Sequence, residues 1–407
     1  MATLRIAIVG GGAAGFFAAV TAKARRPDAE VIVYEKNSKP LAKVAITGGG
    51  RCNLTNSFEQ VGNLRLVYPR GDRLMRRLLH HFDHHDCRAW FEQRGVPLVT
   101  QDDECVFPQS QDAMSVVGCL LAEARRLGVR LVTSRRVESL APLADGRLRM
   151  GFRDGRPEDF DRVAVTTGGS PRGEGLDWLA AMGHEIATPV PSFFTFNIAD
   201  RQLTELMGTV VAAAVSISGT KFHAFGPLLI THWGMSGPAV LKLSSYAARY
   251  LAELAYKAQV AVSWVGECPR REVEALLQSF ALANPQKQTG TWNPFGLPSR
   301  LWHHLLRRGG LAAEKRWAEV GRKDFNRLVE TLVGDVYAVD GRGVYKEEFV
   351  TCGGIALSAV DSNSLESKVV RHLYFAGEVL DIDAVTGGFN LQAAWTTGFV
   401  VGTHIAD

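Results

Sequence analysis

Apolar and polar segments near the N-terminus predict a strand, a turn, a helix and a second strand. Leu4–Val9 is a continuous apolar run that ends at Gly10, which is typical of a strand buried in a parallel sheet. The apolar residues of Ala13–Arg25 have helical spacing, and Val31–Tyr34 is a second short apolar run. Because a helix that joins two parallel strands crosses over right-handed, this segment predicts the start of an α/β fold.

The alternation of predicted helices and strands continues through the next part of the chain. Segment 73–94 shows amphipathic spacing and predicts one or two helices. Segment 115–127 predicts another helix, and strands are expected near 129–133 and 163–167. These elements extend an α/β domain over 1–190.

The pattern changes after Pro189 and Pro191, where strand-like alternation replaces it. This part of the chain predicts two strands and then two helices: 210–217, 260–265, 270–282 and 299–308. The α/β pattern returns near Phe349, with a strand at 373–376 and a closing helix at 391–403. We therefore expect a discontinuous domain that spans 1–190 and 348–407. The β-rich insert spans 191–347, and its helical piece covers about 270–325.

Composition indicates a folded protein that stays out of the membrane. Hydrophobic residues make up 46% and charged residues 22% of the 407, which excludes a disordered chain, and no apolar run reaches the ~18 residues of a membrane helix. The 46 Lys and Arg against 42 Asp and Glu give a net charge of +4, too small to require a nucleic-acid partner. The six cysteines lack a CxxC pair, so we expect reduced thiols, no metal site and a cytoplasmic location.

The first turn matches a dinucleotide fingerprint. Gly10, Gly12 and Gly15 fit G-x-G-x-x-G between the first strand and the first helix. They allow a tight turn, close approach of the backbone to a pyrophosphate, and close packing of helix on strand. Glu35 ends the second strand 20 residues later, where it would bind ribose hydroxyls and repel a 2′-phosphate.

The C-terminal segment favours FAD over NAD as this dinucleotide. The strand 373–376 is followed by Gly377 and Glu378, a carboxylate of the kind that meets the ribityl chain in FAD enzymes. Gly387 and Gly388 then open the final helix, whose N–H groups could stabilise negative charge at the flavin N1–C2=O edge. A side chain at Gly388 is therefore expected to push the flavin ring away.

Eight stretches, in order along nearly the whole chain, carry a resemblance to a known family. They are 6–22 (IAIVGGGAAGFFAAVTA), 33–37 (VYEKN), 46–56 (ITGGGRCNLTN), 105–117, 165–171 (VTTGGSP), 228–245, 350–357 and 366–402. On these motifs the chain resembles the BaiN-like, aminoacetone-oxidase-like FAD-dependent oxidoreductases of bacteria. The resemblance implies a Rossmann-like FAD-binding domain of α/β class, interrupted by an inserted β-barrel-like domain that carries a small helical subdomain.

We predict that FAD is bound by the glycine-rich segments and their neighbours. The predicted contacts are Gly10, Gly12, Ala13, Ala14, Gly15, Glu35, Lys36, Lys43, Gly50, Arg51, Cys52, Asn53, Val137, Thr167, Gly168, Gly169, Gly377, Glu378, Gly387, Gly388, Phe389, Asn390 and Leu391. Within this set Arg51 or Lys43 would neutralise the pyrophosphate. Cys52 could be a redox-active thiol or an inert buried one, and the second reading is favoured because no second cysteine is near in sequence.

Two polar clusters have both a functional and a structural interpretation. His80 and His84, like His81 and His85, are four residues apart and could share a helix face and a metal, but a solvated helix face is favoured. A basic run could face RNA, although a solvated helix face is again favoured: Arg65, Arg70, Arg73, Arg76 and Arg77.

The insert supplies the candidate substrate residues, His232 and Trp233, which either face the flavin or lie in a packed loop. We expect a small-molecule substrate bound between the FAD domain and the insert, and hydride transfer at flavin N5. No later strand is followed by a second G-x-G-x-x-G, so NAD(P)H would act as a transient donor at the substrate face. The leading hypothesis is NAD(P)H-linked reduction of an unsaturated organic substrate. The alternatives are an amine or aminoketone oxidase that uses O₂, and a flavin-dependent RNA-binding or redox-sensing module.

Overall fold

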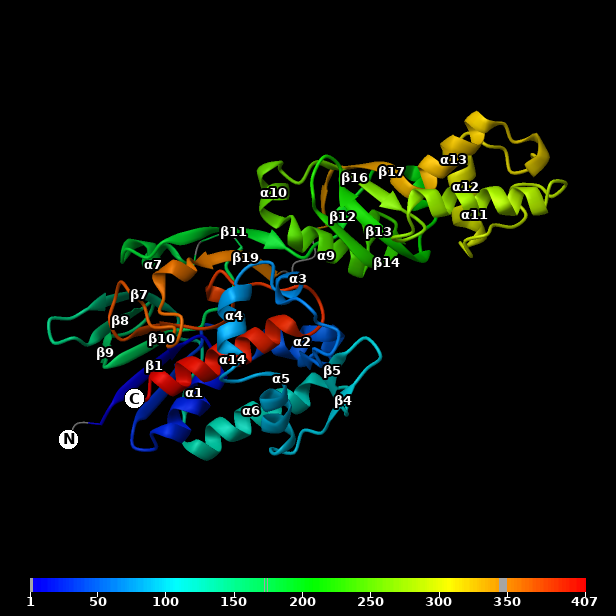
Figure 1. Ribbon diagram of the computed structural model, residues 1–407. Helices are drawn as coiled ribbons and strands as arrows, with labels where there is room; N and C mark the ends of the chain where they lie inside the picture. The colour runs from blue at the N-terminus through cyan, green and yellow to red at the C-terminus, as the bar shows by residue number, and fades with distance from the viewer. Residues whose placement is uncertain (1–2, 172, 174, 344–349) are drawn as a thin grey trace. The chain divides into compact units, whose positions relative to one another are not determined.

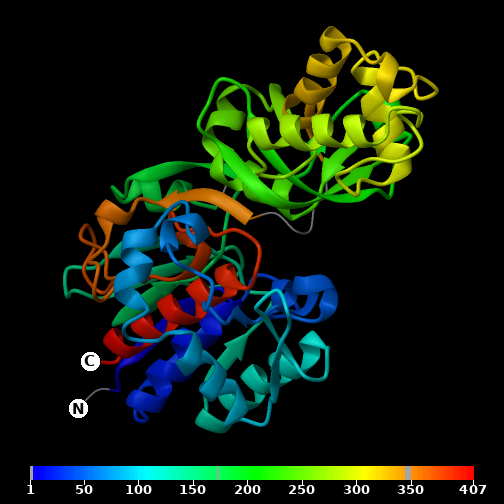
Figure 2. The same ribbon diagram turned by 45° about the vertical axis from the view of Figure 1, so that its right-hand side comes forward.

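The chain folds into two compact units, shown in Figures 1 and 2. Unit 1 comprises Met1–Pro191 and Val350–Asp407, and unit 2 comprises Ser192–Phe349. The computed structural model describes all residues except 1–2, 172, 174 and 344–349. The chain enters unit 2 after Pro191 and returns at Val350.

Unit 1 is built on a five-stranded parallel sheet. Its strands, in spatial order, are β20 (Leu373–Phe375), β10 (Arg162–Val165), β1 (Arg5–Val9), β2 (Glu30–Tyr34) and β6 (Arg130–Val132). Ile8 of β1 pairs with Val33 on one side and Ala164 on the other, and all three are fully buried. Since the strand order reverses at β1, the carboxyl end of this strand is the switch point at which open α/β sheets bind ligands.

Two long helices, α1 (Ala13–Arg25) and α14 (Phe389–His404), pack on this sheet, and a third, α6 (Ala113–Leu127), packs on α1. Figure 1 shows α14, in red, running along α1. A Cβ at Gly398 would lie 2.5 Å from the Ala14 carbonyl oxygen, and a Cβ at Gly402 would lie 2.6 Å from that of Ala18. The two helices therefore run in the same direction in direct backbone contact.

The hydrophobic core beside these helices is largely aromatic. The ring of Phe17 lies 5.2 Å from that of Phe82 and 5.1 Å from that of Trp395, and all three side chains are buried. Fully burying one such side chain contributes about 1.5–3 kcal/mol, so this cluster fixes α14 on unit 1.

Shorter elements complete unit 1. Two small antiparallel sheets contain β3 (Thr55–Asn56), β5 (Cys105–Pro108), β4 (Leu98–Thr100), and β7 (Val137–Pro142), β8 (Leu148–Phe152), β9 (Glu158–Phe160). A further two-stranded sheet pairs β11 (Ile186–Ser192) with β19 (Val350–Ile355). The short helices are α2 (Ala42–Gly50), α3 (Leu64–Val67), α4 (Asp72–Leu78), α5 (His84–Glu92), α7 (Asp177–Ala181) and the 3-10 turns η2 (Leu357–Ala359) and η3 (Gly377–Val379).

Unit 2 contains a seven-stranded antiparallel sheet and a group of helices. The strands, in spatial order, are β17 (Asp335–Val339), β16 (Ala258–Ser263), β13 (Val210–Ile217), β14 (His223–Thr231), β15 (Gly234–Ser236), β12 (Phe196–Asn197) and β18 (Gly341–Arg342). The helices are α8 (Arg201–Thr204), α9 (Pro238–Tyr246), α10 (Ala248–Glu253), α11 (Arg270–Ala283), α12 (Ser299–Arg308), η1 (Trp317–Glu319) and α13 (Arg322–Gly334). Figure 1 shows α11, α12 and α13 gathered at one end of this sheet.

The predicted α/β class with a Rossmann-like core is confirmed. Segment 73–94 contains two helices, because Asp83 caps the second one and its side chain accepts bonds from the N–H groups of His85 and Asp86. The final helix starts at Phe389, two residues before the predicted position. None of the helices in the described part of the chain has the length and apolarity needed to cross a membrane.

Candidate cofactor site

The turn between β1 and α1 is closed to side chains at two glycines and open at the third. Gly10 has a φ of +116°, and a Cβ there would lie 2.4 Å from the Thr166 carbonyl oxygen. A Cβ at Gly15 would lie 1.9 Å from the Gly10 carbonyl oxygen. A Cβ at Gly12 would meet no heavy atom within 4 Å. The fold itself thus requires glycine at 10 and 15, whereas Gly12 leaves room for a ligand to approach the backbone.

The N-terminus of α1 can bind an anion. Gly12 is its N-cap, no side chain of the described residues caps it, and its first turn has no acidic residue. The N–H groups of Ala13 and Ala14 therefore lie at the positive end of a 13-residue helix. Such a helix end at the switch point is suited to a pyrophosphate.

Glu35 is held in a fixed orientation at the end of β2. Its Oε2 accepts a hydrogen bond from the Gly11 N–H at 2.9 Å, and its Oε1 accepts one from the Asn37 N–H at 2.8 Å. Each oxygen keeps a second lone pair, so the carboxylate can still accept ribose hydroxyls. Lys36, the next residue, is exposed. Val137 lies two residues after Arg135, whose backbone N–H donates to the Glu35 carbonyl oxygen.

The segment after β10 lies beside the same turn. Thr167 is exposed, and a Cβ at Gly168 would meet no heavy atom within 4 Å. By contrast, a Cβ at Gly169 would lie 2.6 Å from Glu378 Oε1. Gly168 therefore borders open space, while Gly169 allows its backbone to approach the Glu378 carboxylate.

Glu378 joins three parts of unit 1. Its Oε2 accepts from Lys43 Nζ at 2.9 Å, and its Oε1 accepts from the Thr351 N–H at 2.7 Å. Burial acts to raise the pKa of Glu378, but the Lys43 ammonium and the N–H groups of Thr351 and Gly169 outweigh it and lower that pKa. The Glu378 carboxylate in turn raises the pKa of Lys43, so an ionised pair is favoured here. Lys43 is therefore engaged by Glu378.

The N-terminus of α14 points the same way as that of α1 and extends beyond it. Gly398 lies against Ala14, and Phe389 precedes Gly398 by nine residues. At 1.5 Å per residue, α14 therefore starts about 10 Å beyond Gly12 along the helix direction. Gly377 lies near α1 as well, since its Cβ would lie 2.8 Å from the Ala14 Cβ. The two helix N-termini thus offer two positive ends to one extended ligand.

The structure assigns Gly388 a different reason for being glycine from the one expected. With φ at +88°, its Cβ would lie 2.2 Å from the Thr55 carbonyl oxygen, so protein backbone fills the space expected for the flavin ring. Asn53 fits when its amide nitrogen donates to the Thr55 carbonyl at 3.0 Å and its amide oxygen accepts from the Gly388 N–H at 3.2 Å. Gly388 therefore fastens α14 to β3, and the N–H groups that follow it remain to meet a ligand.

The side chains at the start of α14 are used for packing. Asn390 bonds both backbone groups of Ala384, at 2.9 Å each. The Phe389 ring lies edge-on to Phe58 with centroids 5.1 Å apart, and Leu391 packs on the core. A ligand at this helix end would therefore meet the backbone N–H groups.

The C-terminal end of α2 departs from helical backbone geometry. Gly48, Gly49 and Gly50 all have positive φ, and a Cβ at Gly49 or Gly50 would meet no heavy atom within 4 Å. The Arg51 guanidinium lies over the Phe107 ring at 4.4 Å and donates to Gln111 Oε1 at 3.4 Å. Arg51 is therefore positioned by side chains, with its exposed face available to an anion.

Cys52 is a packing residue. Its side chain is fully buried, and burial raises the pKa of its thiol to about 12. A thiol that is protonated at physiological pH is a poor nucleophile, so the structure favours the inert reading.

The histidine pairs do not share a helix. His80 and His81 follow the end of α4, whereas His84 and His85 open α5. In the described residues no three His, Cys, Asp or Glu side chains are grouped as metal ligands.

The basic run divides into two kinds of residue. Arg70 pairs with the fully buried Asp383, so it is structural. The others are exposed: Arg65, Arg73, Arg76 and Arg77.

His232 and Trp233 form the two-residue turn between β14 and β15 in unit 2. His232 is exposed and meets the Trp233 ring edge-on at 4.4 Å. The Trp233 carbonyl oxygen accepts from the Ile198 N–H at 2.9 Å. Their role toward a substrate stays a prediction.

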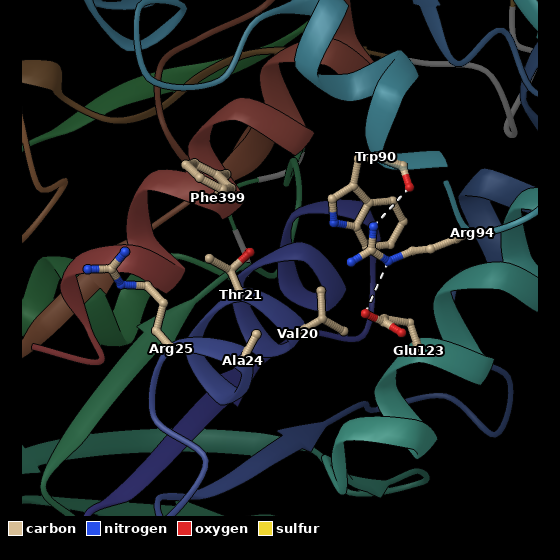
Figure 3. Close-up of a pocket in the computed structure, with 8 residues that line it drawn as sticks. All are labelled: Val20, Thr21, Ala24, Arg25, Trp90, Arg94, Glu123 and Phe399. Atoms are coloured by element: carbon tan, nitrogen blue, oxygen red, sulfur yellow. Dashed lines mark hydrogen bonds and ion pairs between the residues drawn. The ribbon is translucent and has the colours of Figure 1, made fainter. Parts of the chain in front are cut away.

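A cavity of about 260 Å³ lies beside the far half of α1, as Figure 3 shows. Arg94 donates to Glu123 at 3.0 Å and lies 4.0 Å over the Trp90 ring. Ala24, in its wall, is 12 residues from Gly12, or about 18 Å along the helix. This cavity therefore lies away from the switch point.

Long-range contacts at the site had no signal in the sequence. Thr55 donates to Gln392 Oε1 at 2.6 Å, and Gln392 donates to Thr396 at 3.0 Å, all three side chains being fully buried. The Thr55–Gln392 contact, like those of Arg70 and Thr351, joins residues 27 to 337 positions apart, so no local motif reveals it.

Comparison with known proteins identifies the family. The HI0933-like protein Rossmann domain matches residues 4–404. A 3-dehydro-bile acid delta(4,6)-reductase of Clostridium scindens is 27% identical over 99% of each chain. A ribosomal RNA dihydrouridine synthase of Escherichia coli is 27% identical over 96% of this chain and 95% of that one.

Solved structures agree in fold. A 3-ketosteroid-delta4-(5alpha)-dehydrogenase from Rhodococcus jostii RHA1 has a TM-score of 0.53 at 16% identity, covering 99% of this chain and 97% of that chain. A 3-ketosteroid delta1-dehydrogenase from Sterolibacterium denitrificans has a TM-score of 0.52 at 13% identity, covering 99% and 100%. At such identities the likeness concerns the fold alone. Since the family match spans nearly the whole sequence, the chain belongs to the HI0933-like family and is an FAD-dependent oxidoreductase.

Proposed function

We propose that this enzyme reduces a carbon–carbon double bond conjugated to a carbonyl group. The observation that carries the proposal is the pair of relatives at 27% identity over nearly the whole chain. One is named for reducing double bonds of a 3-oxo bile acid, the other for forming dihydrouridine in ribosomal RNA. The substrates differ greatly in size, but each name describes saturation of a double bond in conjugation with a carbonyl. The shared reaction is therefore the most economical proposal for this chain.

The residues of unit 1 fit FAD in an extended form. The open face at Gly12 and the N-terminus of α1 suit the pyrophosphate, and the oriented Glu35 carboxylate suits the adenosine ribose. The N-terminus of α14, about 10 Å farther along, suits the isoalloxazine, with Glu378 and Lys43 near the ribityl chain. FAD bound in this way supplies hydride chemistry at its N5 atom.

The chain's own contribution is electrostatic. The N–H groups of Phe389 and Asn390, at the start of a 16-residue helix, stabilise negative charge placed against them. Lys43 keeps the Glu378 carboxylate ionised beside the same space. Both groups are fixed by the fold before any ligand binds, so they need no reorganisation during the reaction.

A nicotinamide is proposed as the electron donor. The sequence has one G-x-G-x-x-G after a strand, so the donor would bind transiently at the face that also takes the substrate. His232 and Trp233 are proposed as substrate-pocket residues of unit 2.

The test is anaerobic stopped-flow reduction of the holoenzyme by NADH, NADPH and a panel of primary amines. We expect flavin bleaching by one nicotinamide and none by the amines. Turnover is then followed with a 4-ene-3-oxo steroid and with a uridine-containing RNA as acceptors. Bleaching by an amine with production of hydrogen peroxide in air would contradict the proposal in favour of an oxidase.

A further inference from the structure

The helical end of unit 2 has a concentrated excess of positive charge. Residues 284–327 contain nine Lys and Arg against three Asp and Glu, a net charge of +6. The whole chain has a net charge of +4, so the other residues together carry −2. A concentration of cations on one part of a nearly neutral chain favours an anionic partner.

An aromatic side chain is exposed in the middle of this segment. Trp292 is 59% exposed, and its ring meets Phe280 edge-on at 5.4 Å. The loop that carries it is ordered by the buried Asn293, whose Oδ1 accepts from the N–H groups of Phe295 and Leu297 at 3.1 and 3.0 Å. A large ring held outward on a fixed loop does little for folding, but it offers a ready surface for stacking.

Basic side chains contact this ring or the loop that carries it. Lys287 Nζ lies 5.2 Å from the Trp292 ring centre. Arg316 donates to Gln286 Oε1 at 3.2 Å, which places it on the Lys287 side of the loop. His303 bonds the Gly290 carbonyl oxygen at 2.9 Å, which ties α12 to the same loop.

The exposed face of α12 extends the cationic surface. Arg300, His303 and Arg307 are spaced three and four residues apart, so they share one helix face, and all three are exposed. Arg300 is oriented by the Glu205 carbonyl oxygen. Within the described residues, none of the cations of this surface makes an ion pair with a carboxylate.

We propose that this surface docks unpaired RNA. The set, termed the α12 surface, consists of Lys287, Trp292, Arg300, His303, Arg307 and Arg316. Unpaired bases stack on exposed aromatic rings, while Lys and Arg side chains contact the phosphates that follow the bases along the strand. The Glu319 carboxylate accepts from the backbone N–H of Arg316 at 3.2 Å, which leaves the Arg316 guanidinium without a carboxylate partner among the described residues. An exposed ring beside cations that form no ion pairs matches an unpaired strand. The proposal goes beyond the proposed function, because docking depends on unit 2 alone and is independent of the reaction at the flavin.

The test is fluorescence anisotropy of a short fluorescein-labelled single-stranded RNA titrated with the holoprotein at several salt concentrations. Trp292→Ala should weaken binding roughly 5- to 150-fold, the effect of losing one stacked base, and leave the salt dependence unchanged. Lys287→Gln with Arg316→Gln should instead flatten the slope of log K against log salt by about 1.4, as expected for two lost phosphate contacts.

The matched control is Arg125→Gln with Arg153→Gln, which removes the same charge from exposed positions of unit 1. It should bind RNA like the wild type. All variants should keep their FAD and their rate of flavin reduction, which separates failure of docking from failure of the proposed chemistry. Equal RNA affinity of the Trp292 variant, the cation variant and the control would overturn the proposal. Trp292-dependent binding to anionic lipid vesicles without RNA binding would overturn it in favour of a membrane surface.

Discussion

At the scale of single residues, the glycines of the first turn serve different physical purposes. Gly10 and Gly15 are required because protein backbone occupies the space that a Cβ would need. Gly12 has open space around it, so packing gives no reason for glycine there. The sequence motif predicted all three, and the structure separates Gly10 and Gly15, which the fold requires, from Gly12, which borders open space.

Gly12→Ala should therefore affect FAD binding, whereas Gly15→Ala should affect the stability of the apoprotein. Gly12→Ala should leave the melting temperature of the apoprotein nearly unchanged and weaken FAD binding about 10-fold or more, which is about 1.4 kcal/mol. Gly15→Ala should destabilise the apoprotein itself, because its Cβ would lie 1.9 Å from a carbonyl oxygen. Melting curves with FAD titration measure both effects. Equal loss of apoprotein stability in the two variants would contradict this distinction.

Glu35→Ala should weaken FAD binding by roughly 1.5–3 kcal/mol, the range for hydrogen bonds to a charged group. The variant also loses the bond to the Gly11 N–H, so some of the effect acts through the turn. Lys36→Gln, at the exposed neighbouring position, is the control and should have a smaller effect. Titration of the apoprotein with FAD, followed by flavin fluorescence, measures both. An unchanged affinity in Glu35→Ala would remove the ribose assignment.

Glu378 should make stability depend on acid pH. Since its pKa is lowered in the folded protein, its carboxylate stabilises the fold above the ordinary value of 4.5. That contribution is lost as the pH falls below 4.5 and through the lowered pKa. Glu378→Gln should therefore be less stable than wild type at neutral pH, and the difference should shrink in acid. Melting temperatures against pH test this, with Glu59→Gln as the exposed control; a constant difference across pH would refute it.

Among the secondary-structure elements, α14 connects the separate segments of the candidate cofactor site. Its glycines pack on α1, its first turn is fastened to β3, and its buried Gln392 bonds Thr55. The sequence predicted the helix and its opening glycines from local pattern. The reason for Gly388 lay in Thr55, a residue distant in sequence, so local pattern could not show it.

Gly388→Ala should accordingly lower the melting temperature of the apoprotein and release FAD. A matched control is Gly95→Ala, whose φ of +81° carries the same backbone strain but whose Cβ meets no heavy atom within 4 Å. The control should lose only about 1–2 kcal/mol, the cost of a left-handed non-glycine residue. The Gly388 variant should lose more because of the Thr55 carbonyl. Equal losses of melting temperature in the Gly388 and Gly95 variants would mean that the close approach of Gly388 to the Thr55 carbonyl is unimportant.

At the scale of the whole molecule, much of the fold could be predicted from sequence. The β-α-β start and the closing helix each have short-range signals, and both are confirmed as elements. The cluster of Lys43, Thr351 and Glu378 could not be predicted, because it joins three segments through tertiary packing. Likewise, a pattern of histidines four residues apart did not reveal the break between α4 and α5, which the Asp83 cap creates.

We propose that the enzyme transfers hydride to a double bond conjugated to a carbonyl, and this half-reaction can be observed by itself. The experiment is to reduce the FAD-loaded enzyme with dithionite under strict exclusion of oxygen and to mix it with a 4-ene-3-oxo steroid. A uridine-containing RNA is the second acceptor, and the corresponding saturated ketone is the control. We expect rapid return of the oxidised flavin absorbance with at least one conjugated acceptor and none with the saturated ketone. Reoxidation by oxygen alone, with no response to either conjugated acceptor, would contradict it.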